Sequence, residues 1–544
     1  MTDARKTKPK RPPAFRPVKL SLADLLGEEY VAAVCAARAA LTGRDESALL
    51  RLARRKVSFY PRSLQRRLAE RLSEVGSRVS GPLARTAPGA SSAAFGNATH
   101  VEAAPLTGLG YYRVGEDCRL YLAAKSEHYH APLGHSFPGY RLVEHARTLG
   151  LPNATHNNTR GYVTRLLETK LLQAANAPID SAQGKPLDGC EPGRLDRVLN
   201  LETGSLAVEA GIKMMLARFY RIQGSAPRQG SGQASAPPHA GATPVFGVLG
   251  DADGGLTGNY HGTAVLAQTM RGMWPGLAEK LADGGAFKVA PVRPNSIEDL
   301  EALFARYAGP ERPRGATPTE GRGGALAGFL HELVLMNYGG LELEPAFVTR
   351  LYELCEQHDV PTLCDEIQSC LWAPELFLYH RYGVRPTLVA VGKGFPGGEY
   401  PASRILFESR LDVLPQFGAL VTNGQEELAS LCYLVTMRWA QANAAVTEAV
   451  GQYYRRRLEE LAAAWPEQVE TVEGYGHMGA LFFRDVEKAE AFARTVAGGG
   501  VDISVQSYKP ACPPAALTKL PLIADAAVVD FVVGRFAEAI RAIQ

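Results

Sequence analysis

The chain has 544 residues, of which 46% are hydrophobic and 21% are charged, with 59 Lys and Arg against 56 Asp and Glu. This composition is too apolar for a disordered chain and too charged for a membrane bundle. The length suits three or four domains, or one large α/β domain with additions at its ends.

The first twenty residues carry an uneven share of the charge, since they contain seven Lys or Arg residues and a single acid, Asp3. A segment rich in Lys, Arg and Pro buries too little apolar surface to offset chain entropy, which predicts a basic disordered tail over 1–20. Such a tail suits nucleic acid, anionic lipid or an import receptor, but a solvated terminus that aids solubility is the more frequent case. We therefore expect no nucleic-acid partner.

The sequence has no stretch of 18 consecutive apolar residues, and its N-terminus lacks the apolar run of a secretory signal. The eight cysteines include no CxxC pair, which favours reduced thiols over disulfides or a zinc site. We expect a cytoplasmic protein with no membrane partner and no bound metal.

The N-terminal part is predicted to be helical. Helical periodicity with basic clusters runs through residues 21–86, and small, turn-forming residues at 87–100 indicate a linker. Residues 111–124 are expected to form a hairpin of two short strands. We therefore expect a helical extension and linker over 21–104, followed by the first part of a small domain over 105–160.

From about residue 160, helices and strands alternate, which predicts a mostly parallel sheet covered by helices. The expected helices are 161–176 and 206–221, and the expected buried strands are 245–250, 332–338, 361–366 and 387–393. Two Gly/Pro-rich segments, 224–242 and 309–324, interrupt this pattern as surface loops. Residues 161–423 are predicted to form one large domain.

The remaining residues, 424–544, are predicted to form a smaller α+β domain. Its expected elements are helices at 425–443, 445–464 and 526–542, with short strands within 470–484.

The most informative segment contains two neighbouring apolar strands with polar ends. One ends in Asp365, and the next ends in a Gly-Lys-Gly sequence centred on Lys393. In a parallel sheet both ends lie at the carboxyl edge, where ligands bind. A carboxylate and a lysine there can serve a ring-nitrogen cofactor, because the acid holds a pyridinium proton while the lysine forms an imine. Alone, Lys393 fits an ordinary surface lysine between turn glycines better.

Two upstream motifs add to this pair. Thr203, Gly204 and Ser205 precede an apolar helix, and small hydroxyl residues at a helix start offer N–H and O–H groups to a phosphate. The same residues also suit an ordinary N-cap. Tyr260 and His261 follow a Gly-rich turn, and Tyr260 can stack on a flat cofactor, although a buried aromatic at such a corner is the commoner case.

The order of these motifs resembles the class III pyridoxal-phosphate-dependent aminotransferases. The resemblance implies the fold-type-I α/β architecture, a large, mostly parallel sheet domain with helices on both faces plus a smaller C-terminal α+β domain. The motifs are GHSFP (134–138), TGSLAVEAGIK (203–213), NYHG (259–262), DEIQ (365–368), GKG (392–394) and EGYGHMGALF (473–482). The resemblance covers about residues 105–542, which leaves the N-terminal helical segment as an addition.

The resemblance implies roles for the residues at the strand ends. Lys393 corresponds to the lysine that forms an aldimine with pyridoxal 5′-phosphate (PLP) and later moves protons. Asp365 corresponds to the carboxylate that pairs with the pyridine nitrogen. Ile367 and Tyr260 would sandwich the cofactor ring, and Gln368 would hydrogen-bond near its phenolic oxygen.

The phosphate side of the cofactor is implied in the same way. Gly204 and Ser205, with Thr203, match the phosphate loop, and His261 belongs to the cofactor-binding set. In this family a threonine of the partner subunit also reaches the phosphate, and Thr422 is similar in context. The resemblance therefore implies a homodimer whose sites are shared between subunits.

The sequence departs from the family pattern mainly at the positions that select the substrate. The family usually carries a Glu-Pro-x-x-Gly segment after the strand that we place at 332–338, and we find neither the Glu nor the Pro, with Asn337 or Tyr338 in that neighbourhood. The family also has an acidic residue near the end of the N-terminal hairpin, and the corresponding segment here, YLAAKSEHYH (121–130), has no Asp. Lys519 is a candidate stand-in for a C-terminal arginine that often receives a substrate carboxylate.

The implied activity is transfer of an amino group from an amino acid or amine to a 2-oxo acid or aldehyde. Racemases, aminomutases and decarboxylases of this fold use the same lysine and aspartate and remain alternatives. A non-catalytic binding protein is a further alternative, which the presence of both Lys393 and Asp365 disfavours. A P-loop is excluded, because Gly394 stands where Ser or Thr should hold magnesium.

Overall fold

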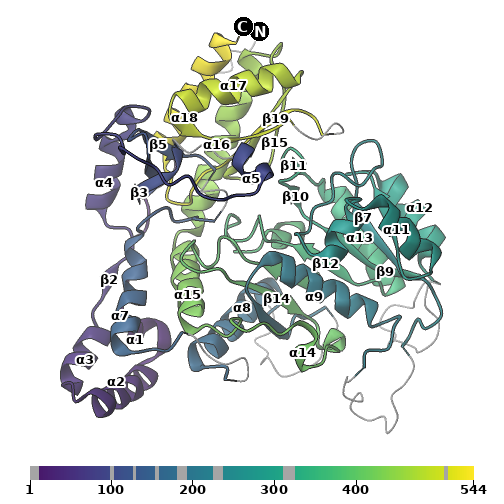
Figure 1. Ribbon diagram of the computed structural model, residues 1–544, viewed down its shortest axis with the longest axis horizontal. Helices are drawn as coiled ribbons and strands as arrows, with labels where there is room; N and C mark the ends of the chain where they lie inside the picture. The colour runs from purple at the N-terminus through teal and green to yellow at the C-terminus, as the bar shows by residue number, and fades with distance from the viewer. Residues whose placement is uncertain are drawn as a thin grey trace, which may run out of the picture.

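The computed structural model describes residues 11–98, 103–125, 130–153, 159–180, 193–223, 237–309, 325–507 and 512–543. Figure 1 shows the purple N-terminal helices at the left, a large teal part built on a sheet at the right, and the yellow-green C-terminal elements at the top. None of the described helices is long and apolar enough to cross a membrane.

The large part is built on a sheet of seven described strands in the order β6-β14-β13-β12-β9-β7-β8. The strands are β6 (Arg197–Leu201), β7 (Val245–Leu249), β8 (Lys288–Val292), β9 (Leu326–His331), β12 (Thr362–Asp365), β13 (Leu388–Val391) and β14 (Ser403–Phe407). Only β14 runs antiparallel to its neighbours among these strands. Asp365 of β12 pairs in register with Ala390 of β13, so these two strands end together at the carboxyl edge.

Helices surround this sheet, and the shorter elements connect its strands. They are α8 (Tyr162–Asp180), α9 (Gly204–Leu216), α10 (Val265–Met270), α11 (Pro275–Asp283), α12 (Ile297–Tyr307), α13 (Pro345–His358), α14 (Gln416–Ala419), η4 (Leu378–Tyr382), η5 (Ser409–Leu411), β10 (Val334–Leu335) and β11 (Leu341–Glu342). All residues of β7, β9, β12 and β13 are buried, as expected for parallel strands covered on both faces. The predicted mostly parallel sheet with helices is therefore confirmed.

The prediction of a sheet strand at 332–338 is wrong. The strand is β9, Leu326–His331, which precedes that segment. Within the predicted segment only β10, Val334–Leu335, is a strand, and it pairs with β11 outside the seven-stranded sheet, while the neighbouring apolar residues are buried by packing. β9 itself contains Gly328, where an added Cβ would lie 2.4 Å from the sulfur of Met215, so α9 packs closely on the strand at this glycine.

The C-terminal elements follow α15 (Glu427–Ala442). They are α16 (Ala444–Ala464), β15 (Val469–Glu473), β16 (Met478–Phe483), α17 (Val486–Gly498), β17 (Val501–Asp502), β18 (Ser504–Gln506), β19 (Ala515–Lys519) and α18 (Ala526–Ala542). An antiparallel sheet in the order β15-β16-β19-β18 lies against α16 and α17, and α18 packs on these two helices. The last helix occupies the residues predicted for it.

The predicted hairpin belongs to a second small sheet. Its strands are β3 (Pro105–Leu109), β4 (Tyr112–Gly115) and β5 (Leu120–Ala123), with β17 joining β5 in parallel. The antiparallel pairing of β4 with β5 confirms the hairpin, while β3 was not foreseen.

The N-terminal region is helical, as predicted, and it continues into the segment that leads to the large part. Its elements are β1 (Lys19–Leu20), α1 (Leu22–Leu26), α2 (Glu28–Thr42), α3 (Glu46–Ala53), β2 (Val57–Ser58), α4 (Arg62–Glu70), η1 (Leu72–Glu74), α5 (Ala93–Ala98), η3 (Pro138–Tyr140) and α7 (Arg141–Leu149). α5 lies inside the segment predicted to be a linker. The loop predictions at 224–242 and 309–324 fall mostly outside the described residues.

The prediction of a disordered tail is wrong for residues 11–20. The ring of Phe15 lies 5.2 Å from that of Tyr60 and 5.7 Å from that of Trp439, and β1 pairs with β2. The prediction relied on the charge of the first twenty residues as a whole and overlooked the apolar residues Phe15 and Val18, which supply this packing. The first ten residues lie outside the described part.

Candidate active site

The site is centred on Asp365, the last residue of β12, which is 5% exposed. Its Oδ2 lies 2.8 Å from Nδ1 of His261, and its Oδ1 accepts the backbone N–H of Ile367 at 3.1 Å. His261 is buried in the segment between β7 and α10. These bonds fix the orientation of a carboxylate at the edge where ligands bind in α/β sheets.

Lys393 follows the end of β13, next to the strand that carries Asp365. Its backbone has a φ of 35°, which is uncommon for a residue other than glycine and is found at functional sites. Burial lowers the pKa of the Lys393 amine, while the nearby carboxylates of Glu332 and Asp365 favour its charged form. A lowered pKa increases the share of neutral amine, which is the form that attacks a carbonyl carbon.

Glu332 is a site residue that the sequence interpretation missed. It follows β9 directly, is 4% exposed, and acts electrostatically on Lys393. The expectation that no glutamate follows this strand was wrong because the strand was placed too late. The signal was present in the sequence, since a carboxylate directly after a buried apolar run is what identified Asp365. The proline of the family motif is replaced by Leu333.

Glycines bring the start of α9 against the ends of β12 and β13. An added Cβ at Gly204 would lie 2.8 Å from Cδ1 of Ile367, and one at Gly392 would lie 3.2 Å from the same atom. Ile367 therefore touches both the helix start and the residue before Lys393. The sequence-predicted phosphate loop and the two catalytic candidates are brought together at this side chain.

Ser205 joins the start of α9 to the loop that carries Tyr260 and His261. Its hydroxyl accepts the backbone N–H of Thr263 at 3.0 Å and lies 3.2 Å from the hydroxyl of Thr263. Thr203 is the exposed N-cap residue of α9, and its side chain makes no capping hydrogen bond. Because the backbone N–H groups of a first helical turn attract anions, this arrangement suits a phosphate.

The positions of Tyr260 and Thr422 do not test the cofactor contacts predicted for them. Tyr260 is half-buried, and the guanidinium of Arg271 lies 4.9 Å from its ring centre. Thr422 is exposed in the turn before α15. Stacking by Tyr260 and a phosphate contact by Thr422 across a dimer stay predictions.

Gln368 completes the segment after β12. The side chain is 7% exposed, and its Oε1 has no hydrogen-bond partner in the described part of the chain. A buried acceptor without a donor is costly, which is expected where a ligand supplies the missing bond. The carbonyl oxygen of Gln368 accepts a short hydrogen bond from Nζ of Lys519.

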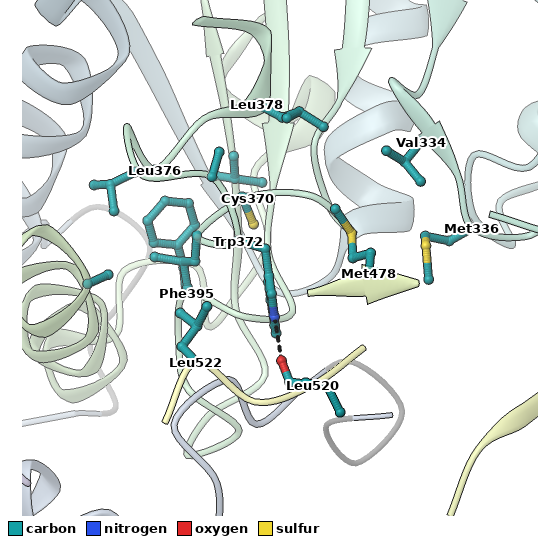
Figure 2. Close-up of a cluster of buried hydrophobic side chains, with 14 of the residues drawn as sticks. Val334, Met336, Cys370, Trp372, Leu376, Leu378, Phe395, Met478, Leu520 and Leu522 are labelled. Atoms are coloured by element: carbon teal, nitrogen blue, oxygen red, sulfur yellow. Dashed lines mark hydrogen bonds between the residues drawn. The ribbon is translucent and has the colours of Figure 1, made fainter. Parts of the chain in front are cut away.

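Lys519 lies at the end of β19 and is fully buried beside the site. Its Nζ is 3.8 Å from the centre of the Trp372 ring, and burial holds the pKa of its amine well below the ordinary value. Nε1 of Trp372 donates to the carbonyl of Leu520 at 3.0 Å, at the centre of the buried cluster that Figure 2 shows. Lys519 therefore links the C-terminal sheet to Gln368 and Trp372.

This set of residues fits pyridoxal phosphate. Asp365 would face the ring nitrogen and Lys393 the aldehyde, while the buried Oε1 of Gln368 provides an acceptor that is otherwise unsatisfied. The glycine-lined start of α9, with Gly204 and Ser205, would take the phosphate. Among the described residues, no group of three or more His, Cys, Asp or Glu side chains is arranged to hold a metal ion.

The fold and these residues define a PLP-dependent enzyme of fold type I. Residues 110–511 match the family model described as aminotransferase class-III. The chain belongs to the class III aminotransferases, a PLP-dependent family.

Individual relatives share a minority of positions with the chain. Ornithine aminotransferase of Emericella nidulans is 26% identical over 294 residues, which are 53% of this chain and 57% of the relative. Glutamate-1-semialdehyde 2,1-aminomutase of Salinibacter ruber is 24% identical over 249 residues, covering 42% of this chain and 52% of the relative. The chain thus spans about half the length of these relatives.

Solved structures share the fold over a longer range. Adenosylmethionine-8-amino-7-oxononanoate aminotransferase of Methanocaldococcus jannaschii superimposes with a TM-score of 0.61 at 17% identity, covering 88% of this chain and 99% of that structure. This similarity supports the fold, while the substrate has to be inferred from the site.

Proposed function

We propose that this chain is a PLP-dependent transaminase that moves an amino group from an amino acid or amine to a 2-oxo acid or aldehyde. The observation that carries the proposal is the half-buried Lys393 beside the buried Asp365 at the carboxyl ends of neighbouring strands, in a chain of the class III family. A protein that only binds partners has no need for a lysine beside a fixed carboxylate.

When bound, PLP supplies an aldehyde that condenses with amines and a ring that withdraws electrons from the substrate carbon. Lys393 would hold the aldehyde carbon, and its lowered pKa suits it to take a proton from one atom and return it to another. Asp365, oriented by His261, would keep a proton at the ring nitrogen. Glu332 would help balance the charge of Lys393.

The other cofactor contacts follow from the same placement. Gly204 and Ser205 would bind the phosphate, Ile367 and Tyr260 would cover the ring faces, and Gln368 would complete the bonds at its phenolic oxygen. We also propose a homodimer in the cytoplasm, in which Thr422 of each chain reaches the phosphate held by the partner. The small-molecule donor and acceptor are the other partners.

An aminomutase is the second candidate. The similarity to glutamate-1-semialdehyde 2,1-aminomutase favours it, because moving an amino group within one molecule uses the same lysine and aspartate.

A screen of single amino donors tests the proposal. Wild-type enzyme loaded with PLP is mixed with one donor at a time, starting with ornithine, and the visible absorbance and the products are followed. A transaminase loses the visible absorbance and releases one oxo product per site, whereas an aminomutase releases an isomer. The Lys393→Ala variant is the inactive control, and a PLP-loaded wild type that converts no donor in a broad panel contradicts the proposal.

A further inference from the structure

A cavity of about 350 Å³ lies between the large part and the C-terminal elements. Its walls come from η4 on one side and from α16 with the loop after β15 on the other. The residues proposed to hold PLP are not among its lining residues. Its volume falls within the range of about 300–1,000 Å³ that is usual for small-ligand sites.

Three arginines line this cavity, Arg381 from η4 and Arg455 and Arg456 from α16. Arg381 forms an ion pair with Glu448 at 3.2 Å, and its guanidinium lies 5.0 Å from the centre of the Tyr475 ring. These contacts hold the planar Arg381 group in one orientation at the cavity wall.

The two arginines of α16 differ in the contacts that their guanidinium groups make. Arg455 pairs with Glu459 at 2.7 Å and donates to the carbonyl of Gly474 at 2.9 Å. Arg456 is exposed and lies over the ring of Tyr453, with no ion pair in the described part of the chain. The Arg456 guanidinium therefore keeps its charge available to a ligand.

The acidic residues of the cavity offset this charge only in part. Burial raises the pKa of Glu342, and the hydroxyl of Tyr382 donates to its carboxylate at 3.4 Å. The carboxylate of Glu448 is engaged by Arg381, and it also accepts a hydrogen bond from Gln452 at 2.5 Å. The cavity keeps a net positive charge on its walls.

We propose that this cavity binds a small organic acid or phosphate ester through its carboxylate or phosphate group. Guanidinium groups present a planar fork of donors that matches such oxyanions, and the aromatic wall at Tyr475 suits a short organic body. A bound anion bridges Arg381 of the large part and Arg456 of the C-terminal part. Because the ligand binds the folded chain, it also raises thermal stability.

Calorimetric titration of the full-length, PLP-saturated chain tests this site. The probes are succinate and inorganic phosphate, with succinamide as the uncharged control. We expect saturable binding of at least one anion, which identifies the preferred group, and no binding of succinamide. Arg456→Glu weakens that binding at least tenfold, and Arg456→Lys weakens it less. Arg494→Glu on α17, an exposed arginine paired with Glu490 at 3.5 Å, leaves it unchanged.

Equal affinities of wild type and Arg456→Glu mean an adventitious ion only, or an anion in the PLP site, and overturn the proposal. Absence of binding by either anion overturns it as well. Arg456 is exposed and outside the proposed PLP site, so the visible absorbance of bound PLP serves as an independent check that the variant is folded. A failure here therefore leaves the proposed transaminase activity untouched.

Discussion

Replacing Gly204 by alanine tests the contact between the first turn of α9 and Ile367. The added Cβ would lie 2.8 Å from Cδ1 of Ile367, 2.9 Å from Cγ1 and 3.1 Å from Cγ2. Carbon atoms in favourable contact are about 3.5–4.0 Å apart, so Ile367 or the helix start has to move. Ile367 is 8% exposed, and its backbone N–H binds Asp365, so any shift reaches the proposed ring-nitrogen contact.

The expected cost is the difference between two opposing effects. Overpacking a buried site costs roughly 1–3 kcal/mol, while alanine in place of glycine in a helix contributes up to about 1 kcal/mol. We therefore expect Gly204→Ala to lower the free energy of unfolding by about 1–2 kcal/mol. If a similar energy is lost from the site, the Kd for PLP rises about tenfold, since 1.4 kcal/mol corresponds to a factor of ten.

Urea unfolding without cofactor and absorbance titration with PLP measure the two effects. Gly534→Ala on α18 is the matched control, because its Cβ would meet no atom within 4 Å and should leave stability equal or slightly higher. Combining Gly204→Ala with Ile367→Ala removes the clash, so the double variant should lose at least about 1 kcal/mol less than the sum of the single losses. Full stability of Gly204→Ala, or additive losses, would refute the packing described here.

Three further predictions concern buried groups around the site. Trp372→Phe removes the donor to the carbonyl of Leu520 and should lower the free energy of unfolding, measured in urea, by about 1–3 kcal/mol. Trp274 is exposed, so Trp274→Phe should have no effect, and equal losses in the two variants contradict the role of this bond. Burial lowers the pKa of His331 from 6.5 to about 4, so the free energy of unfolding is at its full value above pH 6.5 and should fall by about 3 kcal/mol as the pH drops toward 4. His331→Gln should flatten this decline, and an unchanged pH profile in that variant rejects the assignment. Asp365→Asn should keep the fold but lower kcat at least about 100-fold, and near-normal turnover would remove the carboxylate from its proposed role.

The strand ends at Asp365 and Lys393 could be predicted because each follows a short, isolated apolar run with polar residues on both sides. Their meeting at one edge then follows from parallel pairing alone. β9 could not be placed in this way. It is followed at once by a second apolar run, and only pairing with β7 and β12 decides which of the two is the strand. That error hid Glu332.

Contacts between distant segments could not be read from local patterns. Lys519 reaches Gln368 across 151 residues, and the apolar run around Lys519 does not indicate that its amine is fully buried against Trp372. The ordering of residues 11–20 has the same origin, because Phe15 packs on Trp439 of α15, which is distant in the sequence. The motifs located the site, whereas its support came from tertiary packing.

The visible absorbance of the purified full chain after saturation with PLP tests the proposed site directly. A visible band from PLP linked to Lys393 is expected in the wild type, and Lys393→Ala should abolish it. The band should stay in Arg494→Glu. A wild type that binds no PLP, or a Lys393→Ala variant that keeps the band, would contradict the central claim that Lys393 and Asp365 form a PLP site.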